Sequence, residues 1–475
     1  MAGLRQFVVQ LLGLGLAVVI SVLISHQLGA GAQADAFLLG RRLVTGLQEL
    51  MTQVLVLVFI PMLALRPGKE AMVRLASQAA LLGMLGAALF WGGAACIIEL
   101  IAPDMSQGKM LARDVIRIFG LSLPFALVAV VLSSGLNLQQ KFALPALLRL
   151  LPRIGVMLAF AGLVVAPVLP AAWAYVGGST LALLGLILLR PLPKQAGTTN
   201  GPRPNVVAAL VLVLGGQVAL WLETAFAART GLGGVTILEL SQRMAALLGN
   251  TLALALIMPL FARWAANPDR RASDNTWAVI IVAGGILILP QGVLAVVAPS
   301  VIHDLIGLGA FDAMAEMTPL YWVLLLAPFA TLLSRVFLVY HLTCPEQAHK
   351  PMPVVLAMLA DVVVRIICGV VLVPLLGIEA IGLGMVLGPL ASAGVLWMPC
   401  NAALPSRVLG VPLAASVGVG VAALIYVVIG NAGWMPDGKM EGALLLITLS
   451  GLAAGAVFLA LLFRFKVFGL LKEVL

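Results

Sequence analysis

Two stretches of this sequence carry charged and amide side chains within runs that are otherwise apolar. In the first stretch the polar residues recur at spacings of three or four positions, and they are Arg41, Arg42, Thr45, Gln48, Glu49, Thr52 and Gln53. The second stretch holds Glu239, Gln242, Arg243 and Asn250. Such spacing places side chains on one face of a helix. Because arginine keeps its charge and binds phosphate oxygens through paired hydrogen bonds, the pattern indicates recognition of an anionic ligand.

Ion pairing within each helix is the alternative explanation for these residues. Glu239 and Arg243 have the i,i+4 spacing of a helical salt bridge, and Arg42 could pair with Glu49. Internal pairs explain less well why both stretches keep a polar face. We therefore expect the two faces to line a hydrophilic cavity for an anionic substrate. A drug or metal-cation exporter would be expected to line its cavity with acidic residues.

Other polar residues also lie in apolar runs, where a charge is costly and is usually paired or functional. Asp361 and Arg365 are one helical turn apart and are interpreted as a neutralised structural pair. As an alternative, Glu223 and Asp361 are the candidates for binding a coupling cation, Na+ or H+. Gln217 is interpreted as a hydrogen bond between packed helices.

No residue pattern in the sequence indicates catalysis or a bound cofactor. Histidine and cysteine show no metal-ligand spacing, and there is neither a Walker motif nor a catalytic triad. We expect a transporter, not an enzyme, driven by an ion gradient, the membrane potential or the substrate gradient. A membrane-bound glycosyltransferase is the alternative, and it would rest on one acidic loop cluster of Asp304, Asp312 and Glu316, which is interpreted as a solvated face.

The elements that must position these residues are membrane-spanning helices. The chain of 475 residues is 62% hydrophobic and 10% charged, whereas soluble proteins carry about 25% charged residues. This composition excludes a soluble globular protein, a disordered chain and a secreted disulfide scaffold, and the continuous apolar runs disfavour a β-barrel. A span needs about 20 apolar residues. Fourteen such runs begin near Phe7, Asp35, Met72, Asp114, Ala146, Leu169, Asn205, Val235, Trp277, Thr318, Met352, Glu379, Val408 and Glu441.

The distribution of basic residues predicts the orientation of these spans. With the N-terminus inside, most of the 28 lysines and arginines fall in cytoplasmic segments, which satisfies the positive-inside rule. Both termini are therefore predicted to be cytoplasmic. The net charge of +9 needs no nucleic-acid partner. The apolar run after Arg5 is interpreted as a retained first helix, not a signal peptide.

Several short patterns recur at offsets of 198 to 204 positions. They are Gly29-Ala30-Gly31 with Gly231-Leu232-Gly233, Arg42 with Arg243, Pro61 with Pro259, and Pro124-Phe125-Ala126 with Pro328-Phe329-Ala330. This offset spans six helices, so the two halves enter the membrane in the same direction and are related by an axis along its normal. We predict an all-α membrane fold with an N-terminal lobe (1–200), a C-terminal lobe (201–405) and two final helices (406–475).

Three local motifs carry a family resemblance. They are Leu28 to Phe37 followed by Phe59-Ile60-Pro61, then Gln242-Arg243-Met244 running to Pro259, and Lys350-Pro351-Met352-Pro353. These motifs, with fourteen helices arranged as two six-helix lobes and a final pair, resemble the MurJ/MviN family of lipid II flippases. That family belongs to the superfamily of multidrug, oligosaccharidyl-lipid and polysaccharide exporters.

The resemblance implies a flippase that moves an undecaprenyl-pyrophosphate-linked saccharide, with lipid II the first choice, to the outer leaflet of the bacterial inner membrane by alternating access. The implied partners are the lipid bilayer and this substrate, and we expect a monomer. The family's site residues fall on Asp35, Arg42 and Arg243. The polar faces add Arg41, Gln48, Glu49, Gln53, Glu239 and Asn250 as candidate substrate contacts.

Two departures from the family pattern bear on the substrate. The family's first-helix arginines have no counterpart near Gly13 to Ile20, and a further arginine falls on Gln48, although Arg41 could supply a replacement charge. A flippase for another lipid-linked exopolysaccharide or O-antigen unit therefore stays open as an alternative. A drug–cation antiporter of the same superfamily is a further alternative.

Overall fold

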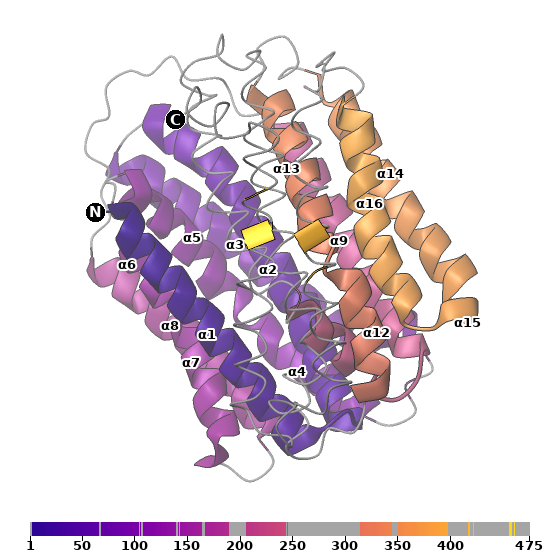
Figure 1. Cartoon of the computed structure of the whole chain (residues 1–475). Helices are drawn as coiled ribbons and strands as arrows, with labels where there is room; N and C mark the ends of the chain where they lie inside the picture. Colours follow the sequence, from indigo (N-terminus) through magenta and orange to yellow (C-terminus); the bar gives the residue numbers. More distant parts are fainter. Residues whose placement is uncertain are drawn as a thin grey trace. The chain divides into compact units, whose positions relative to one another are not determined.

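The described part of the protein is helical, and it falls into two compact units. The computed structural model describes residues 2–65, 68–103, 108–138, 143–163, 167–189, 206–243, 314–343 and 350–397, with a few isolated residues besides, and these ranges contain no strand. Unit 1 is Met1–Leu240 and unit 2 is Ser241–Leu475. Figure 1 shows the helices of each unit as long, roughly parallel rods, which is the arrangement expected of membrane spans.

The two units are built from the following helices. Unit 1 contains α1 (Ala2–Leu28), α2 (Ala32–Leu65), α3 (Lys69–Ile101), α4 (Lys109–Gly120), α5 (Leu123–Leu138), α6 (Ala143–Leu148), α7 (Leu151–Leu158), the π-helical η1 (Ala159–Leu163), α8 (Val168–Leu188) and α9 (Val206–Arg229). Unit 2 contains α12 (Met314–Leu324), α13 (Ala327–Thr343), α14 (Met352–Ile367), the π-helical η3 (Cys368–Leu372), α15 (Val373–Leu376) and α16 (Glu379–Trp397).

Eight helical segments of the described residues are long and apolar enough to cross a membrane. They are Lys69–Ile101, Lys109–Leu136, Leu144–Gly162, Val168–Leu188, Leu210–Arg229, Pro319–Leu338, Met352–Leu376 and Glu379–Trp397. The prediction of an all-α, multi-pass membrane protein is therefore confirmed. Three predicted runs, beginning near Trp277, Val408 and Glu441, lie outside the described residues apart from a few isolated positions in the last two. The count of fourteen spans stays a prediction.

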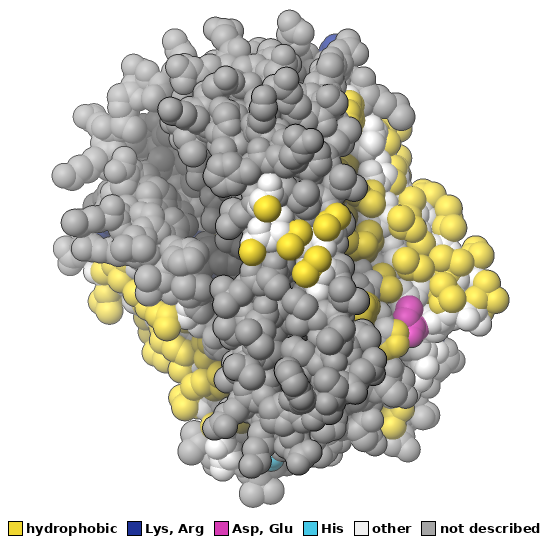
Figure 2. Space-filling view, viewed as in Figure 1, with side chains coloured by type: hydrophobic (Ala, Val, Ile, Leu, Met, Phe, Trp, Pro, Cys, Tyr) yellow, Lys and Arg dark blue, Asp and Glu magenta, His cyan; other side chains and the backbone are white. Residues whose placement is uncertain are grey.

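The outward faces of these helices are apolar, as a lipid environment requires. On α3 the exposed fractions of Leu81, Leu85 and Leu89 are 56%, 59% and 61%. The opposite face of the same helix buries small residues such as Gly83 and Ala87. Figure 2 shows hydrophobic side chains covering the region of α14 and α15. A continuous apolar surface of this kind would favour aggregation in water, whereas it is favourable in contact with lipid chains.

Unit 1 and unit 2 repeat the same local helix breaks. The span of α4 and α5 is interrupted at residues 121–122, and the span of α12 and α13 at residues 325–326. Pro124 and Pro328 each stand at the second position of the helix that follows the break. Proline is tolerated there because the first turn of a helix has no internal acceptor for its N–H. The repeat that the sequence predicts is thus matched by two similar helix breaks.

The core of unit 1 fixes α2 through a chain of aromatic rings. Phe37 of α2 lies edge-on to Phe119 of α4 and to Phe160 of η1, with ring centroids 5.8 and 5.1 Å apart. Phe119 in turn contacts Tyr175 of α8 at 4.9 Å. Offset and edge-on contacts of this kind stabilise aromatic pairs beyond the area they bury. They anchor the first part of α2, four residues before Arg41.

A close approach of α3 and α5 at Gly83 gives a prediction about stability. A Cβ atom at Gly83 would lie 2.5 Å from Pro124 Cα, and backbone cannot yield as a side chain can. We expect Gly83→Ala to lower the free energy of unfolding by about 1–3 kcal/mol, measured as a lower midpoint of thermal unfolding in detergent. Gly92→Ala on the same helix is the control, because a Cβ there meets nothing within 4 Å. An equal response of the two variants would contradict the packing argument.

Candidate functional site: a buried cluster of arginine and glutamate

Arg42 lies on the part of α2 that packs against α9. An added Cβ at Gly46, one turn further along α2, would collide with the side chain of Leu220 on α9. The small residue therefore lets the two helices approach, and the Arg42 side chain, 5% exposed, reaches across to α9. Charged side chains that are buried this deeply need partners.

All three nitrogens of the Arg42 guanidinium donate hydrogen bonds. Nε donates to Thr224 Oγ1 at 2.9 Å, Nη2 to Glu223 Oε2 at 2.6 Å and Nη1 to Glu239 Oε2 at 2.8 Å. Glu223 and Thr224 belong to α9, whereas Glu239 belongs to a helical run over residues 234–243 that follows it. One side chain thus ties three helical segments together.

Glu239 bridges the two arginines of α2. Its Oε1 accepts a short hydrogen bond from Arg41 Nη2, and its Oε2 accepts the bond from Arg42. Two guanidinium groups and two carboxylates therefore form one cluster whose formal charges cancel. We name Arg41, Arg42, Glu223 and Glu239 the charge cluster. Its arginine–glutamate pairs join positions 181 to 198 residues apart in the sequence.

Asp35 anchors the start of the helical run that carries Glu239. Its Oδ2 accepts a hydrogen bond from Gly233 N–H at 2.7 Å, and its Oδ1 accepts bonds from Thr236 N–H at 2.9 Å and Thr236 Oγ1 at 2.7 Å. These N–H groups belong to the first turn of the run, which has no internal acceptors for them and attracts a negative charge. Gly233 has a φ of +86°, a conformation that glycine adopts without strain. A role of Asp35 in substrate contact stays a prediction.

The structure describes fewer contacts for the remaining predicted site residues. Gln48 lies on α2 and accepts a hydrogen bond from Tyr175 Oη at 3.0 Å. Arg243 is helical and half-buried in the run that begins at 234. Glu49 and Gln53 lie within α2, but their side chains are outside the described residues, and Asn250 is outside them altogether.

Two interpretations of other polar residues are confirmed. Arg365 Nε lies 3.0 Å from Asp361 Oδ1, one turn away on α14, so these residues form the expected ion pair. Gln217 Nε2 on α9 donates to the carbonyl of Leu43 on α2 at 3.4 Å, which is a contact between packed helices. Within the described part of the chain, no group of three or more potential metal ligands is found.

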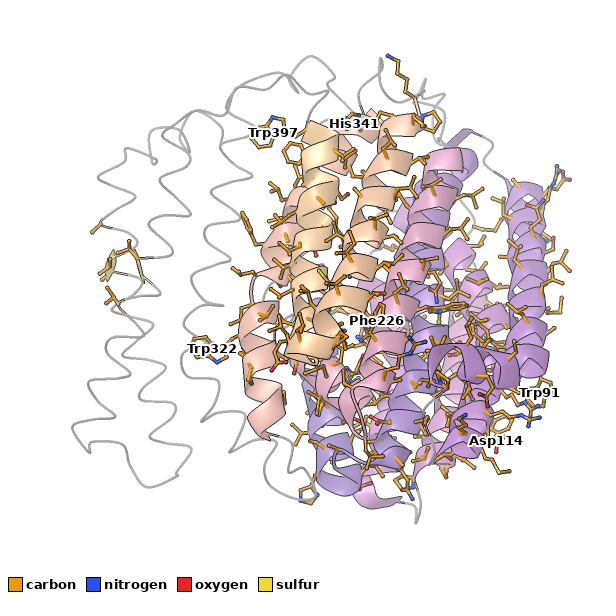
Figure 3. The ribbon with its side chains drawn as sticks, turned by 90° about the vertical axis from the view of Figure 1, so that its right-hand side faces the viewer. Trp91, Asp114, Phe226, Trp322, His341 and Trp397 are labelled. Carbon is orange, nitrogen blue, oxygen red and sulfur yellow. The ribbon has the colours of Figure 1, made fainter. Side chains whose placement is uncertain are left out.

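Unit 1 also has exposed interactions on α3 and α4, which differ from these buried groups in their access to solvent. Figure 3 shows Trp91 and Asp114 near each other on one flank of unit 1, and His341 and Trp397 at one end of unit 2. Arg117 stacks over the Trp91 ring at 5.8 Å, and Lys109 pairs with Glu99 at 3.0 Å at an exposed position. Exposed pairs of this kind add little stability. They serve as references for the buried pairs.

The charge cluster gives a prediction about the balance of buried charge. Arg42→Gln should lower the free energy of unfolding by about 3–5 kcal/mol, because it leaves two carboxylates facing one arginine. The double variant Arg42→Gln/Glu223→Gln should recover much of this loss, since it keeps Arg41 and Glu239 in balance. Midpoints of thermal unfolding of purified protein measure both effects.

The matched control for this prediction is an exposed ion pair. Lys109→Gln removes the cation that pairs with Glu99, whose side chain is 65% exposed, and should cost about 0–1 kcal/mol. A double variant as unstable as Arg42→Gln alone would show that charge balance does not govern the cluster.

Solved structures of transporters share the fold. A lipid II flippase MurJ in an inward closed conformation has a TM-score of 0.76 and 16% identity, with 96% of this chain and 98% of that chain covered. An inward-facing multidrug resistance MATE family transporter of the MOP superfamily follows with a TM-score of 0.63, 14% identity and coverage of 83% and 94%. A MOP superfamily transporter from Pyrococcus furiosus has a TM-score of 0.58, 15% identity and coverage of 86% and 96%.

Identities this low establish the fold alone, and the family follows from the sequence itself. No curated protein sequence matches the chain. The model of the family described as lipid II flippase MurJ, however, matches residues 24–450. This range includes the charge cluster, Asp35 and Arg243. The chain therefore belongs to the lipid II flippase MurJ family.

Proposed function

We propose that this protein moves a polyprenyl-pyrophosphate-linked saccharide, with lipid II as the first choice, from the cytoplasmic to the outer leaflet of the bacterial inner membrane. The observation that carries the proposal is the match of residues 24–450 to the lipid II flippase family. The protein acts as a monomer, takes no cofactor, and has both termini in the cytoplasm. It is a transporter and carries out no covalent chemistry on its substrate.

Arginines within apolar helices support an anionic substrate. Arg41 and Arg42 lie on α2 and Arg243 lies on the run that begins at residue 234. The pyrophosphate of a lipid-linked sugar presents several oxygens to such groups, and guanidinium binds them in pairs. Membrane segments rarely keep charged side chains that have no function.

The charge cluster supports a mechanism of alternating access. It ties α2 to α9 and to residues 234–240, across the predicted division of the lobes at 200/201. In this conformation the Arg42 guanidinium is engaged by Glu223, Glu239 and Thr224. Access of a substrate to Arg42 therefore requires these helices to separate, and their return closes the path behind it.

The proposed driving force is a coupling cation, Na+ or H+, or the membrane potential. Glu223 and Asp361 are the proposed cation ligands. In this conformation Arg42 pairs with Glu223 and Arg365 pairs with Asp361. A cation would have to replace a guanidinium at either carboxylate. At Glu223, which joins α9 to α2, such a replacement would link cation binding to the same conformational change.

A flippase for a different lipid-linked glycan is the second candidate. The observation that favours it is Gln48, which is neutral where the family resemblance implies an arginine. Gln48 accepts a hydrogen bond from Tyr175, so this position on α2 is occupied by a neutral polar pair. With Gln48 in place of an arginine, the site has one positive charge fewer than the family resemblance implies. Such a site suits a head group that carries fewer negative charges than lipid II.

Complementation tests the proposed substrate. We expect the wild-type chain to restore growth in a bacterium depleted of its own lipid II flippase, and Arg243→Ala to fail, because the variant lacks a charge that binds pyrophosphate. Quantitative blotting of membrane fractions establishes that both proteins are present at equal levels. Rescue is scored as colony formation, with a loss of at least about tenfold for the variant.

The matched control replaces an arginine that the site does not use. Arg113 is exposed on α4, and Arg113→Ala should rescue as the wild type does. Absence of rescue by a well-expressed wild type would exclude lipid II and leave the second candidate. Rescue by Arg243→Ala would show that substrate binding does not depend on Arg243.

Labelling with cysteine reagents tests the predicted orientation. Asp114 and Lys350 are exposed and are predicted on opposite sides of the membrane. In a background that lacks the four native cysteines, a membrane-impermeant maleimide applied to intact spheroplasts should label Asp114→Cys. Lys350→Cys should react only after lysis. The reverse labelling pattern would show that the chain has the opposite orientation in the membrane.

A further inference from the structure

Glu239 holds two guanidinium groups in the way a bound phosphate would. One of its carboxylate oxygens accepts a hydrogen bond from Arg41, and the other accepts one from Arg42 Nη1 at 2.8 Å. A phosphate that lies between two arginines is held in a similar way. Each guanidinium donates to one phosphate oxygen, or each donates to a pair of phosphate oxygens. The space between Arg41 and Arg42 is therefore shaped for a small anion, and a side chain of the protein fills it.

Glu239 is also the more accessible of the two carboxylates. The side chains of Arg42 and Glu223 are 5% and 8% exposed, whereas those of Arg41 and Glu239 are 10% and 12% exposed. If Glu239 turned away, Arg42 would keep Glu223 and Thr224 as partners. Two arginines would then face one carboxylate, which leaves a site with a net positive charge of one.

We infer that Glu239 occupies an anion site between Arg41 and Arg42 and competes there with the phosphate oxygens of the substrate. The inference rests on the proposed function and extends it by naming a residue that sets the affinity for the diphosphate group. Glu239 is a competitor, and it does not itself contact the substrate. The exchange of one anion for another keeps the buried arginines compensated at each stage, which avoids the large cost of an unpaired buried charge.

The site is tested by binding a diphosphate to the purified protein. Isothermal titration of the full chain in detergent compares two probes, inorganic pyrophosphate and geranyl pyrophosphate, with wild type and with Glu239→Gln. Removal of the competing charge should tighten binding by about tenfold. Tightening for both probes means that the site takes any diphosphate, and tightening for the lipid probe alone means that it takes the lipid-borne group. Unchanged or weaker binding of both probes overturns the inference.

Two further variants separate competition from other effects of the change. Glu99→Gln removes a carboxylate that also pairs with a basic residue, Lys109, but at an exposed position outside the charge cluster, and should bind as the wild type does. Arg41→Gln/Glu239→Gln should lose the gain, because one half of the anion site is gone. Equal tightening in Glu99→Gln would point to a general electrostatic effect and would refute the assignment.

A shorter side chain keeps the test decisive if Glu239→Gln does not fold. Glu239→Asp retains the charge, but the carboxylate is one methylene too short to hold both guanidiniums. Binding should then tighten by a smaller factor, about threefold, and unchanged or weaker binding overturns the inference. None of these titrations involves transport. A chain that fails to rescue a flippase-depleted cell can still show the competition, so the two ideas fail separately.

Discussion

The guanidinium of Arg42, held inside a bundle of apolar helices, sets the main constraint on unit 1. An unpaired charge in such a place costs several kcal/mol or more, so the surrounding helices must supply acceptors. Glu223, Thr224 and Glu239 do so at 2.6 to 2.9 Å. Since these acceptors lie on α9 and on the run after it, the need to pair one side chain fixes where α2 meets both segments. Gly46 permits this approach, because a larger residue would collide with Leu220.

Two further sets of contacts hold α2 in the register that this pairing needs. The rings of Phe37, Phe119 and Phe160 fix the first part of the helix against its neighbours. Asp35 supplies three acceptor contacts to Gly233 and Thr236 and so fixes the helical run that presents Glu239. Together these contacts make a bridge between Arg41, Arg42 and Glu239 possible at one relative placement of the helices.

Composition and spacing predicted the class of fold and the polar face of α2, but they did not predict the partners. Arg41 and Arg42 lie on α2, where the three- and four-residue spacing, a local signal, predicted a polar helix face. Glu223 and Glu239 bond to them over 181 to 198 residues of sequence, and no local pattern encodes such a pairing. Thr224, Thr236 and Tyr175 were not identified at all, since single polar residues in apolar runs have no periodicity. Gly233 was matched to Gly31 as part of the repeat, but that match did not predict the turn whose N–H groups donate to Asp35.

The neutrality of the charge cluster constrains any route by which an anion can reach the arginines. An anionic head group that enters must either displace a carboxylate or bring a cation with it, because two arginines already face two carboxylates. Displacement of Glu239 is the less costly step, since Arg42 then retains Glu223 and Thr224. A displaced carboxylate needs a new partner, and a proton or a metal cation supplies one. On the proposed mechanism, the transported anion therefore enters the cluster that also holds Glu223, a proposed cation ligand, and charge balance couples the two binding events.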